Sequence, residues 1–327
     1  MELAGDILHY LNAAAALALA AVAAVQARWG GRPGLWGAAA FAALAVVLRV
    51  GAVGGEEPAE WVSKALVCVL LAFPYLLVRF AASLELVGGR FVRFAGLATI
   101  AVLLLSLVLP SPPEEGAPQP AWYLPYVVAV LAFWTALSVA TIVGLWRGGA
   151  GQPTLTRRRT RLMSAATAAM NVLILLAPLD TGAGAGELVV QALLSVSLVS
   201  FAVGYAPPPF VRLAWRQPEQ EALRQATEEL VGAMTVPQVT DTLLPHVARI
   251  VGGSGAALCD EHRRVIASVG SVPAIEHAGE AVEIRLSPPF GALMVATTPL
   301  TPFFGREELA LLHALAALAD LSLARCV

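Results

Sequence analysis

Charged residues are scarce in this sequence. Only 13% of its 327 residues are Asp, Glu, Lys or Arg, whereas 58% are hydrophobic, and an ordinary soluble domain carries roughly 25% charged residues. The formal net charge is −2, so no concentrated basic face is available to neutralise the phosphates of a nucleic acid. We therefore expect a membrane protein whose main partner is the lipid bilayer and which binds no nucleic acid.

Lysine is almost absent. Lys64 is the only lysine of the chain, and it follows Glu60 by four positions, a spacing that predicts an ion pair along one helix. A retinal-binding protein would need a lysine in the middle of its last transmembrane helix, and residues 188–206 contain none. The sequence thus excludes a rhodopsin.

Cysteine is also rare. Cys68 lies inside an apolar run, and Cys259 and Cys326 lie far downstream, without the paired spacing of zinc sites or disulfide frameworks. We predict three free thiols, no metal site and no cofactor.

Long apolar runs fill the first two thirds of the chain. A helix needs about 20 mostly apolar residues to cross a bilayer. The first basic residue, Arg28, comes after the first apolar run, whereas a secretory signal has basic residues before its apolar run. We therefore expect the first run to be retained as a helix. Seven segments approach the required length and predict a seven-helix transmembrane bundle in residues 1–206: Ile7–Val25, Gly34–Val53, Trp61–Phe80, Phe94–Pro110, Trp122–Trp146, Leu162–Leu179 and Leu188–Ala206.

The loops between these spans alternate in charge. Arginines follow spans one, three, five and seven, and acidic residues follow spans two, four and six. Loops rich in arginine stay in the cytoplasm. We therefore predict a multi-pass protein of the inner (cytoplasmic) membrane, with its N-terminus outside and its C-terminal domain inside. The most basic loop holds Arg147, Arg157, Arg158, Arg159 and Arg161.

Polar residues inside the spans are few. A proton or ion transporter would carry carboxylates or histidines deep in the bundle, and the central portions of these spans offer only Asn171, Gln191 and scattered Ser and Thr. Asn171, Gln191, Ser195 and Ser197 are candidates to line a small ligand-binding pocket between spans six and seven. Such side chains also serve as ordinary hydrogen bonds between helices, and both interpretations stay open.

The last third of the chain has the composition of a soluble domain. Residues 207–235 are predicted to be a linker that contains a helix from Gln217 to Leu230, with Pro218 near its start. A second helix is predicted from Val236 to Val251 and ends at Gly252 and Gly253. Short β-type runs and a final apolar helix follow at Gly255–Cys259, Arg264–Val269, Ala281–Leu286, Gly291–Thr297 and Arg306–Arg325. Residues 236–327 therefore predict a small α+β domain with a central antiparallel sheet.

One part of this domain resembles a known family. The residues that carry the resemblance are Val239–Gly255, Ala256–Leu258, Phe290–Val295 and the run Phe303–Leu312, in which two phenylalanines precede acidic residues and a leucine pair. This order resembles the GAF-domain family over residues 219–327. With seven preceding spans, the chain resembles the sensory half of an actinobacterial membrane sensor histidine kinase, which implies a kinase core as the downstream partner. Only a short loop fits between Val269 and Ala281, so we expect no cyclic nucleotide or chromophore site.

No catalytic centre is predicted. His313 is followed by Ala314 and Leu315, whereas the phosphoacceptor histidine of such kinases is followed by an acidic residue; His246, His262 and His277 lack a partner set that the sequence can define. Residues 252–255 lack the Lys-Ser/Thr ending of a phosphate-binding loop. We expect a sensor that relays a stimulus from the bundle to a GAF-like domain within a homodimer. A small permease or a membrane enzyme with an accessory domain is the alternative, and solute flux into proteoliposomes would distinguish it.

Overall fold

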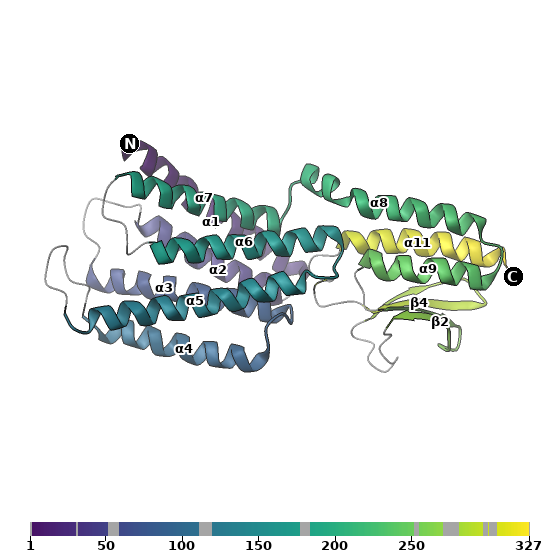
Figure 1. Cartoon of the computed structure of the whole chain (residues 1–327), viewed down its shortest axis with the longest axis horizontal. Helices are drawn as coiled ribbons and strands as arrows, with labels where there is room; N and C mark the ends of the chain where they lie inside the picture. The colour runs from purple at the N-terminus through teal and green to yellow at the C-terminus, as the bar shows by residue number, and fades with distance from the viewer. Residues whose placement is uncertain are drawn as a thin grey trace. The chain divides into compact units, whose positions relative to one another are not determined.

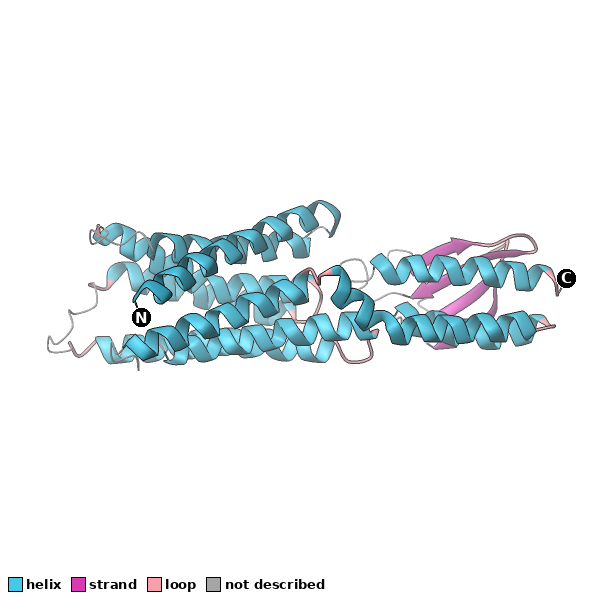
Figure 2. Cartoon of the chain, turned by 90° about the horizontal axis from the view of Figure 1, so that it is seen from above, coloured by secondary structure: helices cyan, strands magenta, loops and turns pink. Residues whose placement is uncertain are grey.

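The chain forms two compact units in the computed structural model. The structure describes residues 2–30, 32–51, 59–110, 120–176, 184–251, 255–270, 281–296, 300 and 306–326. The first unit comprises Met1–Arg147 and Arg159–Pro207, and the second comprises Gly148–Arg158 and Pro208–Val327. The described strands all lie in the second unit (Figure 2).

Long helices build the first unit. In chain order they are α1 (Glu2–Gly30), α2 (Arg32–Gly51), α3 (Glu60–Ser83), α4 (Gly89–Val108), α5 (Tyr123–Gly148), α6 (Thr154–Leu176) and α7 (Gly184–Tyr205) (Figure 1). α1 packs against α2 and α7, α2 against α3, and α3 against α4. Aromatic pairs fill the interior: Phe73 of α3 stacks on Trp134 of α5, and Phe41 of α2 meets Phe201 of α7 edge to face.

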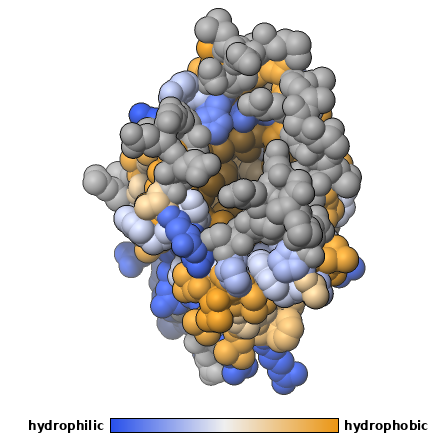
Figure 3. Space-filling model, turned by 90° about the vertical axis from the view of Figure 1, so that its left-hand side faces the viewer, coloured by the Kyte–Doolittle hydropathy of each residue, from blue (hydrophilic) through white to orange (hydrophobic). Residues whose placement is uncertain are grey.

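Six of the described helices are long and apolar enough to cross a membrane, namely α1 to α5 and α7. Their outward side chains are also apolar: Phe94, Leu97 and Val108 of α4 are 67%, 69% and 81% exposed. Figure 3 shows hydrophobic residues, in orange, over much of the coloured surface that it draws. Because such a surface is favourable in lipid rather than in water, the first unit is a helical, multi-pass membrane bundle.

α6 differs from the other six. Its first two turns carry Arg157, Arg158, Arg159 and Arg161, which we expected in a loop, and only Leu162–Leu176 of the predicted sixth span lies in the described residues. The count of seven spans therefore stays a prediction. The ion pair predicted at the start of α3 is confirmed, with 3.0 Å between Lys64 Nζ and Glu60 Oε1.

An antiparallel sheet of four described strands forms the base of the second unit. The strands are β1 (Gly255–Asp260), β2 (Val265–Gly270), β3 (Ala281–Arg285) and β4 (Phe290–Ala296), in the order β2-β1-β4-β3. All four predicted strands are confirmed to within one residue at each end. Asp260 stabilises the turn between β1 and β2, because its Oδ1 accepts hydrogen bonds from the backbone amides of His262 and Arg264 at 2.8 Å.

Three helices lie on one side of this sheet (Figure 1). They are α8 (Pro209–Gly232), α9 (Val236–Val251) and α11 (Arg306–Ala324), and the outermost of them, α8, packs against the other two. Alternate strand residues such as Leu258 and Leu293 join Leu243 and Leu315 in one core, while Ala257, Cys259 and Met294 form a second cluster from the opposite strand positions. The loop predicted between Val269 and Ala281, with His277, lies outside the described residues.

α8 begins earlier than the sequence predicts. Pro209 occupies its first turn, where a missing N–H costs no hydrogen bond. Pro218, expected near the start, lies inside the helix instead. Its Ala226 and Leu230 are fully or almost fully buried in the core of the second unit, so packing of the C-terminal half stabilises a helix that Pro218 interrupts locally.

Candidate functional site

A buried chain of polar side chains crosses the first unit between α1, α2 and α7. Ser195 Oγ donates to Asn12 Oδ1 at 2.8 Å, and Asn12 Nδ2 donates to Gln191 Oε1 at 3.0 Å. Gln191 Nε2 lies 3.2 Å from His9 Nδ1, and His9 Nε2 lies 2.7 Å from the carbonyl oxygen of Leu48. Asn12 and Gln191 are 2% and 8% exposed. We call these four side chains, His9, Asn12, Gln191 and Ser195, the polar chain.

The backbone carbonyl of Leu48 sets the direction of the hydrogen bonds that His9 makes. A backbone carbonyl only accepts, so His9 Nε2 must carry the proton that reaches Leu48. In the neutral ring Nδ1 is then an acceptor for the amide of Gln191. A second proton on His9 would place a donor against the donor of Gln191, and the Gln191 amide would have to turn.

The four residues predicted to line a pocket have different surroundings in the structure. Gln191 and Ser195 both belong to the polar chain. Ser197 is fully buried and donates to Leu193 on its own helix at 2.9 Å. Asn171 is buried on α6, and its Oδ1 has no hydrogen-bond partner among the described residues. A ligand pocket formed by all four residues stays a prediction.

His9 and Asn12 were not among the site residues predicted from the sequence. Both lie in the first span, three positions apart, which places them on one face of a helix. That spacing was the available signal. Their partners lie 179 and 182 positions away along the chain, and no local pattern indicates which span they face.

The C-terminal end of α7 is held by an arginine of α6. Arg159 Nε donates to the carbonyl of Gly204 at 3.0 Å, and its terminal nitrogen donates to the carbonyl of Tyr205. Gln26 of α1 also donates to Tyr205 O, at 3.3 Å. The last carbonyls of a helix have no partner within it and carry its partial negative charge, so a buried guanidinium stabilises this end. α6 and α7 approach closely here. A Cβ atom at Gly204 would lie only 2.8 Å from Cγ of Met163.

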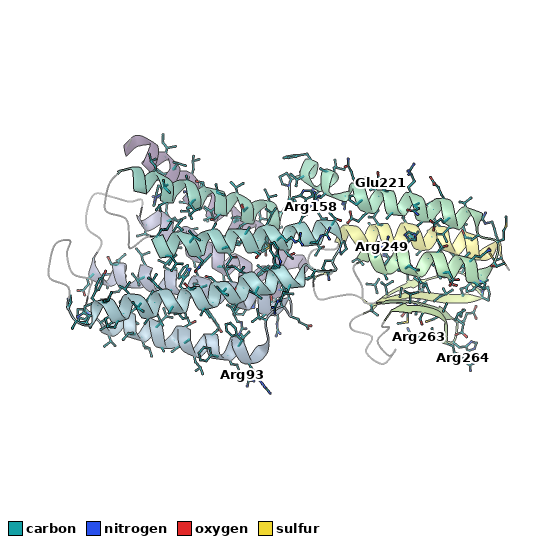
Figure 4. The ribbon with its side chains drawn as sticks, viewed as in Figure 1. Arg93, Arg158, Glu221, Arg249, Arg263 and Arg264 are labelled. Carbon is teal, nitrogen blue, oxygen red and sulfur yellow. The ribbon has the colours of Figure 1, made fainter. Side chains whose placement is uncertain are left out.

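The other end of α6 is bound by α8, within the second unit. Glu219 Oε1 accepts a hydrogen bond from the backbone amide of Thr154, the first residue of α6, at 2.6 Å. A carboxylate is favourable at a helix N-terminus. Next along α6, Arg158 lies 5.9 Å over the ring of Trp215 of α8 (Figure 4). A pocket of about 290 Å³ adjoins this contact and is bordered by Arg157, Glu219 and Arg249.

Titratable groups elsewhere in the second unit are dispersed. His246 of α9 faces Glu229 of α8 at 3.7 Å, and His262 and His313 are exposed. Burial, and next the carboxylates of Asp260 and Glu283, raise the pKa of the Cys259 thiol above its ordinary value. Among the described residues no group of His, Cys, Asp and Glu side chains is arranged to hold a metal ion.

No protein-family model matches the chain, and no curated protein or solved structure matches it. A function for these residues is therefore inferred from their hydrogen bonds and from the packing of the helices that carry them.

Proposed function

We propose that this protein is a membrane sensor that passes a change in its transmembrane bundle to a cytoplasmic GAF-like domain. The observation that carries the proposal is the position of α7. Near one end it holds Gln191 and Ser195 of the polar chain, near the other it holds the carbonyls bound by Arg159, and α8 begins at Pro209 directly after it. From Gln191 to Tyr205 a helix rises about 21 Å, so one rigid element joins both contacts.

The polar chain provides two arrangements for such a switch. Ser195 Oγ lies 2.8 Å from Asn12 Oδ1 and 2.9 Å from the carbonyl of Gln191. A hydroxyl has one proton and can donate to only one of these acceptors. A stimulus that binds one arrangement more tightly than the other shifts the equilibrium between the two arrangements. The shift involves both helices that carry the polar chain.

The proposed membrane placement has seven spans, with α6 as the sixth, the N-terminus outside and the second unit in the cytoplasm. The alternation of acidic and arginine-rich loops supports it. A reporter enzyme fused behind Cys326 is expected to be active only in its cytoplasmic form. Activity of a periplasmic reporter at that position would contradict the topology.

The proposed second unit is a GAF-like dimerisation domain with a kinase or other output module as downstream partner. A four-stranded antiparallel sheet with α8, α9 and α11 on one face supports the fold. Val231, Met234 and Leu321 are 59%, 79% and 67% exposed. We propose a second copy of the chain as the partner that covers these apolar side chains.

Cysteine cross-linking in native membranes tests the relay without knowledge of the stimulus. Cys68, Cys259 and Cys326 are replaced by serine, and single cysteines are introduced at Gln220, Arg224 and Glu228, which are exposed on α8 at helical spacing. The pattern of disulfide-linked dimers is compared between the native bundle and the Asn12→Ala bundle. Ser197→Ala is the matched control, because the Ser197 hydroxyl donates to Leu193 of its own helix.

A relay predicts that Asn12→Ala changes which α8 position cross-links most and that Ser197→Ala leaves the pattern unchanged. Identical patterns in all three bundles would contradict the relay. Absence of cross-linked dimers at every α8 position, with monomeric protein after gentle solubilisation, would contradict the homodimer.

A further inference from the structure

A basic cleft opens on the first unit among α2, the end of α3 and the turn into α4. Its volume is about 920 Å³, and its lining includes Arg32 and Trp36 of α2, Arg79 of α3, and Glu85 and Gly88 of the turn. Two arginines against one glutamate make the lining net positive. Arg79 falls inside the predicted third span, Trp61–Phe80.

Arg79 is half-buried and has no carboxylate partner in the part of the chain that the structure describes. Its guanidinium lies 4.3 Å from the ring centroid of Trp36. Stacking on an aromatic face orients the planar group and leaves its N–H donors at the edge. Such a fork matches the oxygens of a phosphate group, to which it donates two parallel hydrogen bonds.

The position of the cleft across the bilayer indicates the source of that phosphate. Arg79 lies nineteen residues after Glu60, the first residue of α3, which is about 28 Å along a helix. The hydrocarbon core of a bilayer is about 30 Å thick. If Glu60 marks one interface, Arg79 therefore lies at the headgroups of the other. Leu35, on the wall of the cleft, is 61% exposed and offers an apolar surface to an acyl chain.

We propose that this cleft binds the phosphate headgroup of an anionic phospholipid, with Arg79 and Arg32 as the phosphate-binding residues. Basic pockets between transmembrane helices on the cytoplasmic side are suited to such headgroups. The inference rests on the membrane placement of the bundle and is independent of any relay, because it involves neither the polar chain nor α8.

Lipid binding to the purified full chain tests the proposal. The protein is held in a neutral detergent and titrated with phosphatidylglycerol, with phosphatidylcholine or with inorganic phosphate, and bound lipid is counted by native mass spectrometry. We expect phosphatidylglycerol to be retained in preference to phosphatidylcholine, and inorganic phosphate to compete weakly. Equal retention of the two lipids would overturn the proposal, and full displacement by millimolar phosphate would assign the cleft to a free anion instead.

Variants locate the binding. Arg79→Gln is expected to weaken phosphatidylglycerol retention about tenfold, the loss typical of one charge-assisted hydrogen bond. Arg93→Gln is the matched control, because Arg93 is exposed on α4 and projects away from the helices (Figure 4). Gly88→Glu gives a second test that leaves both arginines intact: no atom lies within 4 Å of a Cβ at Gly88, whose backbone is extended. It should also weaken retention. Native retention in both Arg79→Gln and Gly88→Glu would place the lipid elsewhere.

Discussion

Arg159 of α6 donates from Nε to the carbonyl oxygen of Gly204 on α7 across 3.0 Å. Arg159 is 8% exposed, and its guanidinium also donates to the carbonyl of Tyr205. This contact lies where the chain leaves the bundle for the second unit. It therefore decides how firmly the end of α7 is held.

Arg159→Gln is expected to lower the stability of the bundle by about 1.5–3 kcal/mol, the usual contribution of a hydrogen bond to a charged group. The reason is that the last carbonyls of α7 lose a buried cationic donor. Thermal unfolding in detergent measures the change. Arg161→Gln, two residues along, is the control, because Arg161 is exposed and makes a cation–π contact with Trp146 instead of a contact with the end of α7. Equal losses in the two variants would show that the contact with α7 contributes nothing specific.

Asn12 and Gln191 are expected to be energetically coupled. A double-mutant cycle with Asn12→Ala and Gln191→Ala should give an interaction energy of about 0.6–1.7 kcal/mol, the range for hydrogen bonds between transmembrane helices. Unfolding in mixed micelles measures each variant. The cycle of Asn12→Ala with Ser197→Ala should give no coupling, because Ser197 donates to its own helix. Coupling of the same size in both cycles would argue for a general change in packing.

Glu219 is expected to stabilise the start of α6. Glu219→Ala removes the acceptor of the Thr154 amide and should cost about 1–2 kcal/mol, as loss of a helix cap does. Hydrogen exchange at Thr154 should become faster. Glu221→Ala is the matched control, since Glu221 is exposed on the same helix (Figure 4). Unchanged exchange at Thr154 in Glu219→Ala would contradict this role.

Cys259 is expected to react slowly with alkylating reagents at neutral pH. Burial and the nearby carboxylates of Asp260 and Glu283 raise its pKa above the ordinary 9.0, and the thiolate is the reactive form. In a chain with Cys68 and Cys326 replaced by serine, labelling by iodoacetamide should accelerate only above pH 9 and should be fast in denaturant. Fast labelling of the folded chain at pH 7 would contradict a raised pKa.

The same shift has a consequence for stability. Above pH 9 the unfolded chain loses the Cys259 proton first, while the folded chain retains it. The contribution of this thiol to stability is therefore fully present below the ordinary pKa and is lost as pH rises through the raised pKa. Cys259→Ala should remove that part of the alkaline destabilisation, which unfolding midpoints at pH 8 and pH 10 measure.

The sequence predicts most of the elements of this fold. Apolar runs place α1 to α5 and α7, and alternation with turn residues places the four strands to within a residue. These features are local, since helix length and strand alternation are set by neighbours along the chain. The start of α8 was predicted wrongly, because Pro218 is an accepted first-turn residue, whereas the helix begins at Pro209 and continues through Pro218.

The sequence by itself determined that the chain enters a membrane: too little charge and too many long apolar runs leave no other stable environment for its surface. Only the tertiary structure decided which polar groups meet. Asn12 finds Gln191 across 179 positions, Arg159 caps a helix instead of lying in a loop, and Arg79 stacks on Trp36 at the edge of a cleft. Such pairings depend on how helices pack, and packing is set by the shapes of surfaces far apart in the chain.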